Sequence, residues 1–586
     1  MRVTGLLAAL PVCSALRTWR PIRELERDIV DDTLKTASAL ETTTTTASLT
    51  DLYPAHNLTV PIDHFHNDSL YEPHTNETFQ LRYWYDAQHY RPGGPVILLA
   101  SGETSGVNRL PFLQKGLLAR LAQATHGIGV VLEHRYYGTS FPYDNLTTES
   151  LRFLRLEQAL ADTAYFAKHA VFNVTGGKDA SVSPSKAPWV IYGGSYAGVF
   201  AALARIVYPD VFWGAISSSG VTVAIYDYWE YYEAHRLYAP KQCVNVLEKL
   251  IHVVDQILLP KSNAYGYAGQ ELMKRSSVDD KDVRDEETAR IVQLKEVFGL
   301  ANITHNDDFA SVLSSGLDPF QGTNWDPAVS DPDFSYFCGN LTSDALLYPD
   351  LDDRSNTVQS LLGATSYREN IAELTQPMLN FIGWVEAAHP CAAGKTQDQC
   401  FSNRNETFYQ QDDISQRWRA WPYQFCTQWG YLPTGSGVPV DRLPLVSRLL
   451  TVEYYATICR DAFGIYGTPD VESVNKYGAY NVRYPRVAFI DGEADPWRAA
   501  TVHAIGHTDA DRKSTLDEPF LLIAGGAVHH WDENGLFANE TTDDLPPAPI
   551  REVQAAEEEF VKEWVAAWVA RDLLHEADGY LDDGGL

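Results

Sequence analysis

The stretch Trp189-Val-Ile-Tyr-Gly-Gly-Ser195-Tyr-Ala-Gly198 joins an apolar run to a turn of small residues with a serine at its tip. The apolar part predicts a buried strand, and the alanine-rich run from Val199 to about Tyr208 predicts a helix. A chain that turns this sharply from strand to helix has no room for large side chains beside the serine. The serine hydroxyl is therefore expected to stand clear of the sheet.

This strand–turn–helix pattern is typical of the nucleophile elbow of α/β-hydrolases, which have a mostly parallel sheet. The next amide, that of Tyr196, would point at a developing oxyanion. Ala197 stands where the strict G-x-S-x-G pattern has its last glycine. Because the short pattern also fits a plain Gly-Ser turn after a buried strand, the prediction needs a second observation.

A carboxylate loop follows later in the chain. In an α/β-hydrolase the acid comes after the serine, at the end of a strand, where it orients the catalytic histidine. The run 486–490 predicts a short buried strand, and Asp491, Glu493 and Asp495 follow it. Position favours Asp495 only modestly over the other two carboxylates.

A histidine loop comes after the last predicted strand, as this triad order requires. The run 520–524 predicts that strand, and Gly525-Gly-Ala-Val-His529-His530 follows it. A histidine here would take the serine proton and return it to the leaving group. Spacing cannot choose between His529 and His530.

Longer motifs point to a particular family. They are Pro61-Ile-Asp-His-Phe65 with Thr78-Phe79 and Arg82-Tyr-Trp84, Gly94-Pro-Val-Ile-Leu98 with Gly102-Glu103, Glu133-His-Arg-Tyr-Tyr-Gly-Thr-Ser140, Gly193-Gly-Ser-Tyr-Ala-Gly198, Gly492-Glu-Ala-Asp-Pro-Trp497 and Gly526-Ala-Val-His-His530. With these motifs the chain resembles the serine peptidases that include lysosomal Pro-Xaa carboxypeptidase, dipeptidyl peptidase II, thymus-specific serine peptidase and related secreted fungal enzymes. The resemblance runs from about Val60 to about Ala567.

The resemblance assigns roles that spacing leaves open. It implies that Ser195 is the nucleophile, that the acid is Asp495, which precedes Pro-Trp, and that the base is His529, the first of the pair. It also implies an oxyanion hole formed by Tyr196, Gly102 and Glu103, and a substrate pocket in which Trp497 receives a proline ring. A flat indole suits a flat apolar ring that has no backbone N–H.

Three positions depart from the family pattern. Val528 interrupts the usual Gly-Ala-His-His, and Asn534 stands where the carboxypeptidase has an arginine that tunes the histidine pair. The oxyanion loop reads Ser101-Gly-Glu-Thr104 instead of Gly-Gly-Glu-Gly. The triad survives these changes, but the pH dependence and the peptide specificity are expected to differ.

The function that follows is a serine-type peptidase acting through an acyl-enzyme, with the cleaved bond after proline as the resemblance implies. An esterase or lipase on the same core and an inactive binding homologue are the alternatives. Carboxypeptidase, dipeptidyl-peptidase and endopeptidase modes stay open. Peptides are the expected partners, a homodimer is allowed, and the residue spacings predict no cofactor and no metal. For work in acid, the pKa of His529 should lie below the usual value of about 6.5.

The net charge of the chain limits the partners and the compartments that suit it. A net charge of −31 argues against nucleic acid as a partner. It suits either an acidic compartment, where carboxylates partly protonate, or an ordinary acidic secreted protein. No apolar run approaches the roughly 18 residues of a membrane-spanning helix, so no membrane span is predicted.

The N-terminus predicts export. Residues 1–18, with Arg2 before an apolar stretch and small residues, are typical of a signal peptide, and 19–50 of a leader or linker. We therefore expect a secreted protein or one in a vacuolar or lysosomal lumen. Nine N-x-S/T sequons agree with this: Asn57, Asn67, Asn76, Asn145, Asn173, Asn302, Asn340, Asn405 and Asn539.

The cysteines agree with an oxidising compartment. Of the seven, Cys13 falls in the predicted signal peptide, and the other six lie in the middle of the chain. Six cysteines allow 15 pairings. The resemblance implies the pairs Cys243–Cys338, Cys391–Cys400 and Cys426–Cys459.

The chain divides into a core and an insertion. Alternating strand and helix patterns at 51–224 and 460–574 predict the α/β-hydrolase core. The aromatic, cysteine-bearing stretch 225–459 predicts a largely helical cap, which would limit access to the serine. Single aromatic residues there (Trp418, Trp421, Tyr423, Trp429) fit cap packing better than a substrate pocket. Residues 575–586 form an acidic tail expected to lack regular structure.

Overall fold

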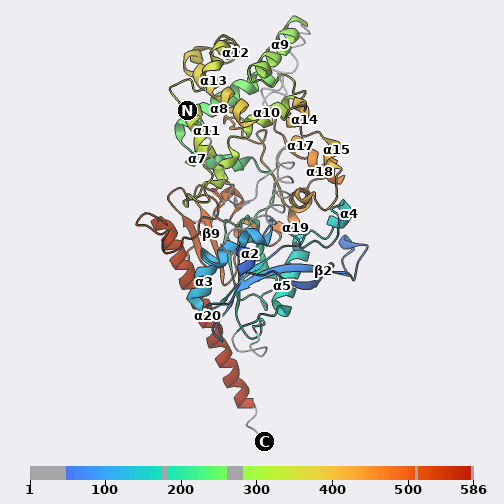
Figure 1. Cartoon of the computed structure of the whole chain (residues 1–586), viewed down its shortest axis with the longest axis vertical. Coiled ribbons are helices and arrows are strands. Elements are labelled where there is room, and N and C mark those ends of the chain that lie inside the picture. Colours follow the sequence, from blue (N-terminus) through green and yellow to red (C-terminus); the bar gives the residue numbers. More distant parts are fainter. Residues whose placement is uncertain (1–47, 175–181, 260–280, 508–511, 583–586) are drawn as a thin grey trace.

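The structure is a computed structural model that describes residues 48–174, 182–259, 281–507 and 512–582. The predicted signal peptide and most of the predicted leader lie outside these residues. Figure 1 shows an elongated molecule with a twisted sheet at one end of its long axis and a helical region at the other. Within the described residues, no helix is both long and apolar enough to cross a membrane.

One eight-stranded sheet forms the core, in the order β1-β2-β4-β3-β5-β6-β9-β10. Strands β1 and β2 pair antiparallel, as do β2 and β4, and all other neighbours are parallel. The strands are β1 (His56–Pro61), β2 (Thr78–Asp86), β3 (Val96–Ala100), β4 (Ile128–Leu132), β5 (Trp189–Gly194), β6 (Gly214–Ser218), β9 (Val487–Gly492) and β10 (Phe520–Ile523). The predicted fold class is therefore confirmed.

The central strands are apolar on both faces because helices cover both. In β3, Val96, Leu98 and Ala100 belong to one apolar cluster, and Ile97 and Leu99 belong to the other. Helices α5 (Leu156–His169) and α6 (Tyr196–Val207) pack in the first cluster; the second includes η2 (Gly106–Leu113), α3 (Leu117–Thr125) and α20 (Ala548–Asp582). This alternation explains why these strands read as continuous apolar runs.

The chain between β6 and β9 is mainly helical. Its longer helices are α7 (Glu233–Tyr238), α8 (Lys241–Leu258), α9 (Lys281–Val297), α10 (Asn306–Ser314), α11 (Asp333–Leu341), α12 (Ser355–Gly363), α13 (Ile371–Ala388) and α18 (Thr457–Phe463). Shorter ones are α14 (Gln397–Phe401), α15 (Glu406–Tyr409), α16 (Ala420–Gln424), α17 (Val452–Tyr455) and α19 (Glu472–Asn475). The exact domain boundaries remain a prediction.

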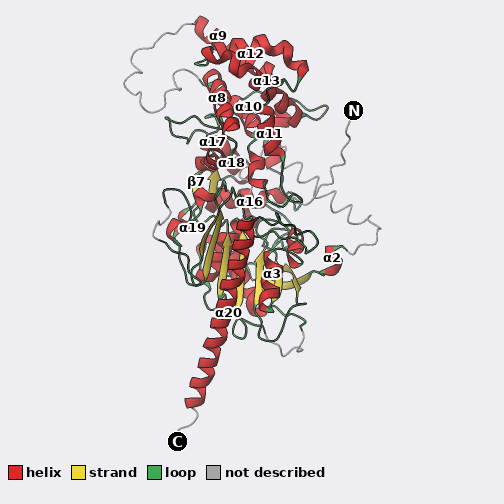
Figure 2. Ribbon diagram, turned by 90° about the vertical axis from the view of Figure 1, so that its left-hand side faces the viewer, coloured by secondary structure: helices red, strands yellow, loops and turns green. Residues whose placement is uncertain are grey.

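This helical region joins the core without a break in the apolar packing. Its buried side chains, such as Leu250 and Phe381, belong to the same cluster as helices α5 and α6. A short parallel pair, β7 (Ile225–Asp227) with β8 (Gly430–Leu432), lies where the chain leaves and re-enters the core. Figure 2 shows the helices stacked above the carboxyl edge of the sheet.

Three disulfides hold the helical region: Cys243–Cys338, Cys391–Cys400 and Cys426–Cys459. These are the pairs that the family resemblance implies. The first links α8 to α11 across 95 residues of sequence, and the third closes a loop of 33. Each closed loop restricts the unfolded chain and so favours the folded one.

Helix α20 extends further than the sequence predicts. Its first turns pack on α3, and Phe560 and Trp564 are buried against the sheet. The helix continues to Asp582, into the segment expected to lack regular structure, and its end projects away from the body of the protein (Figure 1).

Candidate active site

Ser195 sits in the sharp turn between β5 and α6. Its backbone has φ 64° and ψ −128°, a region that L-residues rarely adopt. A Cβ at Gly193 would lie 2.3 Å from the carbonyl oxygen of Ala197, and one at Gly198 would lie 2.6 Å from that of Ser218. The small residues of the elbow are therefore required by close backbone packing on both sides of the serine.

Asp495 and His529 meet at the carboxyl edge of the sheet. Nδ1 of His529 donates to Oδ2 of Asp495 at 2.8 Å, and both side chains are buried. The two loops follow β9 and β10, which are parallel neighbours. This contact orients the imidazole and directs Nε2 away from the carboxylate.

The other carboxylates that follow β9 have different partners. Asp491 accepts a hydrogen bond from His503 Nδ1 at 2.6 Å, and Glu493 accepts one from the backbone N–H of Gly526 at 2.7 Å. The second histidine of the pair, His530, forms an ion pair with Glu533 at 3.0 Å. Of the candidate acids and bases, the structure thus brings Asp495 and His529 together.

The histidine loop packs directly on the elbow. The N–H of Ser195 donates to the carbonyl of Ser218 at 2.9 Å, and the N–H of His530 donates to the hydroxyl of Ser219, the next residue, at 2.8 Å. A Cβ at Gly194 would lie 2.5 Å from the Glu533 carboxylate. The elbow and the histidine loop are therefore both hydrogen-bonded to the chain at the end of β6.

Ser195 Oγ and His529 Nε2 are both buried, and neither has a hydrogen-bond partner among the described residues. They do not bond to each other in this structure. Catalytic contacts of this kind are commonly long before substrate binds. Both atoms are thus left available for each other and for a substrate.

The surroundings of His529 favour its neutral form. Burial lowers the pKa of the imidazole from its usual value, and the positive charge of His530 acts in the same direction. The Asp495 carboxylate opposes the shift but does not cancel it. The neutral form is the one that accepts a proton.

The predicted oxyanion residues lie around the elbow. Gly102 has φ 70°, and a Cβ there would lie 3.2 Å from that of Ala197. Tyr196 is the first residue of α6, where backbone N–H groups have no acceptor inside the helix. Burial raises the pKa of the neighbouring Glu103 to about 7.

The run 133–140 forms hydrogen bonds with the loop after β3, with the elbow and with helix α5. Glu133 is buried and accepts hydrogen bonds from the Gly106 N–H at 2.9 Å and from Arg82 and Ser140, which fixes the loop after β3. His134 Nε2 lies 3.0 Å from the Tyr196 hydroxyl. Nε and Nη2 of Arg135 donate to the two carboxylate oxygens of Asp162 in α5, at 2.6 and 2.7 Å. The motif therefore helps to position the loop after β3 and the elbow.

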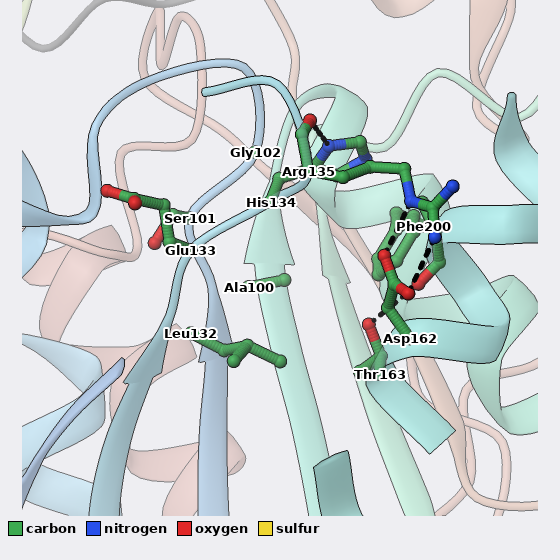
Figure 3. A pocket seen from close by; sticks show the side chains of 11 residues that line it. Ala100, Ser101, Gly102, Leu132, Glu133, His134, Arg135, Asp162, Thr163 and Phe200 are labelled. Carbon is green, nitrogen blue, oxygen red and sulfur yellow. Dashed lines mark hydrogen bonds and ion pairs between the residues drawn. The ribbon is translucent and has the colours of Figure 1, made fainter. Parts of the chain in front are cut away.

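A narrow cavity lies beside this run. It is lined by Ala100, Ser101, Gly102, Leu132, Glu133, His134, Arg135, Ala159, Asp162, Thr163 and Phe200. Figure 3 shows the Arg135 side chain pointing toward Asp162, with dashed lines for the contacts between them. Ser195, Asp495 and His529 do not line it. The Arg135–Asp162 ion pair in its lining makes it part of the scaffold and distinguishes it from a substrate pocket.

Trp497 lies in an aromatic cluster beside the histidine. Its ring stacks on Tyr228 at 5.4 Å, meets Tyr231 and Tyr431 edge-on, and lies 6.4 Å from the His529 ring. Its Nε1 donates to Gln321 at 2.8 Å. The indole is fully buried in this structure. The sequence pointed to Trp497 but carried no signal for its partners, which come from three separate segments.

Two of the four aromatic residues noted in the cap stretch reach the elbow. The rings of Trp421 and Trp429 lie 5.9 and 5.3 Å from that of Tyr196. Trp418 stacks on Phe408, and Tyr423 packs on Phe463. The first pair therefore connects the helical region to the elbow, and the second pair packs within the helical region.

Sequence reasoning missed a group of buried carboxyls beneath the elbow. Asp532 accepts a hydrogen bond from the Ser218 hydroxyl at 2.6 Å, and its pKa is raised to about 7 by burial and by the charge of Glu533. Glu557 of α20 faces Asp532, and burial raises its pKa well above the usual value. Glu533 has a lowered pKa because His530 is beside it. No local sequence pattern indicates this cluster, because its members come from distant segments of the chain.

The sequons differ in accessibility. Asn57, Asn67, Asn76, Asn173, Asn302 and Asn539 are exposed, whereas Asn145, Asn340 and Asn405 are partly buried. The side chain of Asn405 caps α15, and that of Asn340 donates to the Tyr336 carbonyl. The exposed six are therefore the better predicted glycan sites.

Comparison with known proteins places this site in a family. The family model described as "Serine carboxypeptidase S28" matches residues 61–314 and 358–543, more than half of the chain. An Arthroderma benhamiae protein named "Probable extracellular serine carboxypeptidase" is 48% identical over 89% of this chain and 69% of its own length. "Serine protease vicPb" of Bipolaris victoriae is 29% identical (76% and 80% covered), and the mouse "Thymus-specific serine protease" is 27% identical (78% and 79%).

Among solved structures, proline iminopeptidase of Mycobacterium smegmatis is 10% identical, with a TM-score of 0.29 over 87% of this chain and 99% of that one. A similarity this low carries no argument about function. The family match and the relative at 48% identity do, and the residues matched by the family model include the elbow, acid and histidine loops. The chain therefore belongs to the serine carboxypeptidase S28 family and is a serine peptidase.

Proposed function

We propose that this chain is an extracellular serine carboxypeptidase that cleaves after proline through an acyl-enzyme. The observation that carries the mechanism is the bond between His529 and Asp495, next to an elbow whose serine hydroxyl is unpartnered. The printed name of the relative at 48% identity supports both the carboxypeptidase mode and the extracellular location.

In this mechanism Ser195 Oγ attacks the carbonyl carbon as His529 Nε2 takes its proton. The oxyanion receives hydrogen bonds from the Tyr196 amide and from the loop at Gly102 and Glu103. His529 then protonates the leaving amine, and the acyl group stays on Ser195. Water attacks this ester in a second step, with His529 again as base, which releases the product and restores the serine.

The preference for proline rests on the cluster of Trp497, Tyr228, Tyr231 and Tyr431. These rings form a buried apolar cluster in which the Trp497 ring lies 6.4 Å from that of His529, and Gln321 fixes the indole by accepting from Nε1. A proline side chain brings a compact apolar ring and no N–H to satisfy, so it suits such a surface. A charged or strongly polar side chain would lose its hydration there.

One assay separates the alternatives. The purified protein is incubated with peptides that carry proline at the second, penultimate or internal position, and with short-chain esters, and the products are identified by mass spectrometry. The proposal expects release of the last residue from penultimate-proline peptides, and no product with Ser195→Ala. Removal of an N-terminal dipeptide, internal cleavage or faster ester hydrolysis would overturn the carboxypeptidase assignment.

The pocket has its own test. Trp497→Phe keeps an aromatic ring but loses the bond to Gln321, so kcat/KM for proline peptides should fall relative to alanine peptides. Trp418→Phe is the matched control, since Trp418 is buried in the cap. An unchanged proline-to-alanine ratio in Trp497→Phe would contradict the assigned pocket. Light scattering of the same samples tests whether the protein forms a homodimer.

A further inference from the structure

The connection between β1 and β2 brings together three side chains that the peptidase mechanism does not use. Asp63, His66 and His74 each present one potential ligand atom, and these three atoms all lie within 4.8 Å of one another. Two come from the loop just after β1, and the third comes from the approach to β2. We propose that these residues form a zinc-binding site.

Asp63 is oriented as a metal-binding carboxylate. It is buried, and its Oδ1 accepts hydrogen bonds from the Phe65 N–H at 2.8 Å and from Gln158 Nε2 of α5 at 2.9 Å. These contacts fix the plane of the carboxylate and leave Oδ2 facing the histidines, 2.8 Å from His74 Nδ1. Partners of this kind orient the ligands in established metal sites.

The histidines stand at the open side of the carboxylate. The segment before His74 is held by Arg152, which donates to the Pro73 carbonyl at 2.8 Å. The side chain of His74 is 24% exposed, and His66 is exposed, with its ring 5.7 Å from that of His74. Zinc bonds of about 2.0–2.1 Å in a tetrahedron place ligand atoms about 3.4 Å apart. The three ligand atoms, which lie within 4.8 Å of one another, would therefore have to move closer together, and the exposed His66 is the least confined of the three side chains.

The composition of the cluster favours a first-row transition metal over calcium or magnesium. Calcium and magnesium take oxygen ligands, whereas two imidazoles and one carboxylate suit zinc. Three protein ligands leave the fourth position to water. The site lies in a loop that is already tied to α5, since Gln158 donates to Asp63 and His64 Nε2 lies 2.7 Å from Asp162 Oδ1. Bound zinc would add a link between the two ends of the β1–β2 connection, a role separate from peptide hydrolysis.

The test is zinc binding by the full-length protein, purified without a histidine tag, treated with EDTA and studied at neutral pH. Calorimetric titration with ZnCl₂ should show one tight site per chain, and zinc should raise the melting temperature. His66→Gln and His74→Gln should each weaken that site more than tenfold. His305→Gln, which changes an exposed histidine in the helical region, should leave it unchanged.

Cobalt gives a second, independent measurement. Co²⁺ at this site should show the visible absorption of a four-coordinate ion, and His66→Gln should lose it. Because His66 is exposed, this variant is expected to fold. The cluster would be only a hydrogen-bonded loop if His66→Gln and His74→Gln both left the zinc affinity and the zinc-induced rise in melting temperature unchanged. The lack of any saturable zinc site would lead to the same conclusion. Activity of the EDTA-treated enzyme is expected to persist, so the peptidase proposal stands or falls separately.

Discussion

Nδ1 of His529 donates to Oδ2 of Asp495 at 2.8 Å, although the two residues belong to loops after different strands. Asp495→Asn replaces the acceptor oxygen by an amide that can favour the wrong imidazole tautomer. We expect kcat for a peptide substrate to fall on the order of 10⁴-fold with the fold intact, as measured by steady-state kinetics and circular dichroism.

Glu493→Gln is the matched control for this change. Glu493 lies in the same loop and accepts from the Gly526 N–H, and the glutamine carbonyl oxygen can still accept that bond. Its kcat should stay within a few fold of the original enzyme. A loss in Glu493→Gln as large as that in Asp495→Asn would remove Asp495 from its assigned role.

The pH profile of kcat/KM should reflect the environment of His529. Burial and the neighbouring His530 lower the pKa of His529, while Asp495 and Glu533 act in the opposite direction. A base with a lowered pKa stays neutral in mild acid, so the acidic limb should lie below about 6.5. His530→Gln removes one cause of the shift and should move this limb upward. A limb at or above 6.5 in the original enzyme would refute the assignment.

Gly138 tests whether the 133–140 run positions the site. Its φ is 59°, and a Cβ there would overlap the buried Glu133 carboxylate. Gly138→Ala should destabilise the protein by about 1–3 kcal/mol, because the clash displaces the Glu133 carboxylate, which holds the loop after β3. Thermal melting and kcat would both fall. Gly467→Ala, at a site with open space around the glycine, should change neither.

The buried carboxyls should make stability depend on pH. Burial raises the pKa of Asp532 to about 7 and that of Glu557 well above its usual value. The folded protein thus keeps protons that the unfolded chain, with carboxyl pKa values of about 4, releases. Their contribution to stability is complete below about pH 4 and is lost as pH rises toward 7.

Glu557→Gln should flatten this dependence, because a neutral amide can donate to Asp532 and has no proton to lose. Melting temperatures measured between about pH 4 and 7 should fall less steeply than in the original protein. Glu559→Gln, an exposed change on the same helix, should leave the slope as it was. Equal slopes in all three proteins would mean that these carboxyls do not hold the protons.

Much of the core could be predicted because the patterns that indicate its strands and turns lie within short stretches of sequence. The apolar run 189–192 before small residues predicts β5 and the elbow, and the runs at 486–490 and 520–524 predict β9 and β10. The end of α20 shows the limit of this reasoning. Acidic and glycine-rich residues favour a frayed end, yet the helix runs on to Asp582.

The sequence by itself determined the fold class, the elbow serine and the strand ends at which an acid and a base must lie, because these follow from residue periodicity and turn chemistry over a few neighbours. Tertiary structure decided which carboxylate pairs with which histidine, which rings surround Trp497, and that Asp532 meets Glu557. It also brought His74 to Asp63. Such contacts join segments far apart in the chain, and only the packed fold sets the distances and the loss of solvent on which they depend.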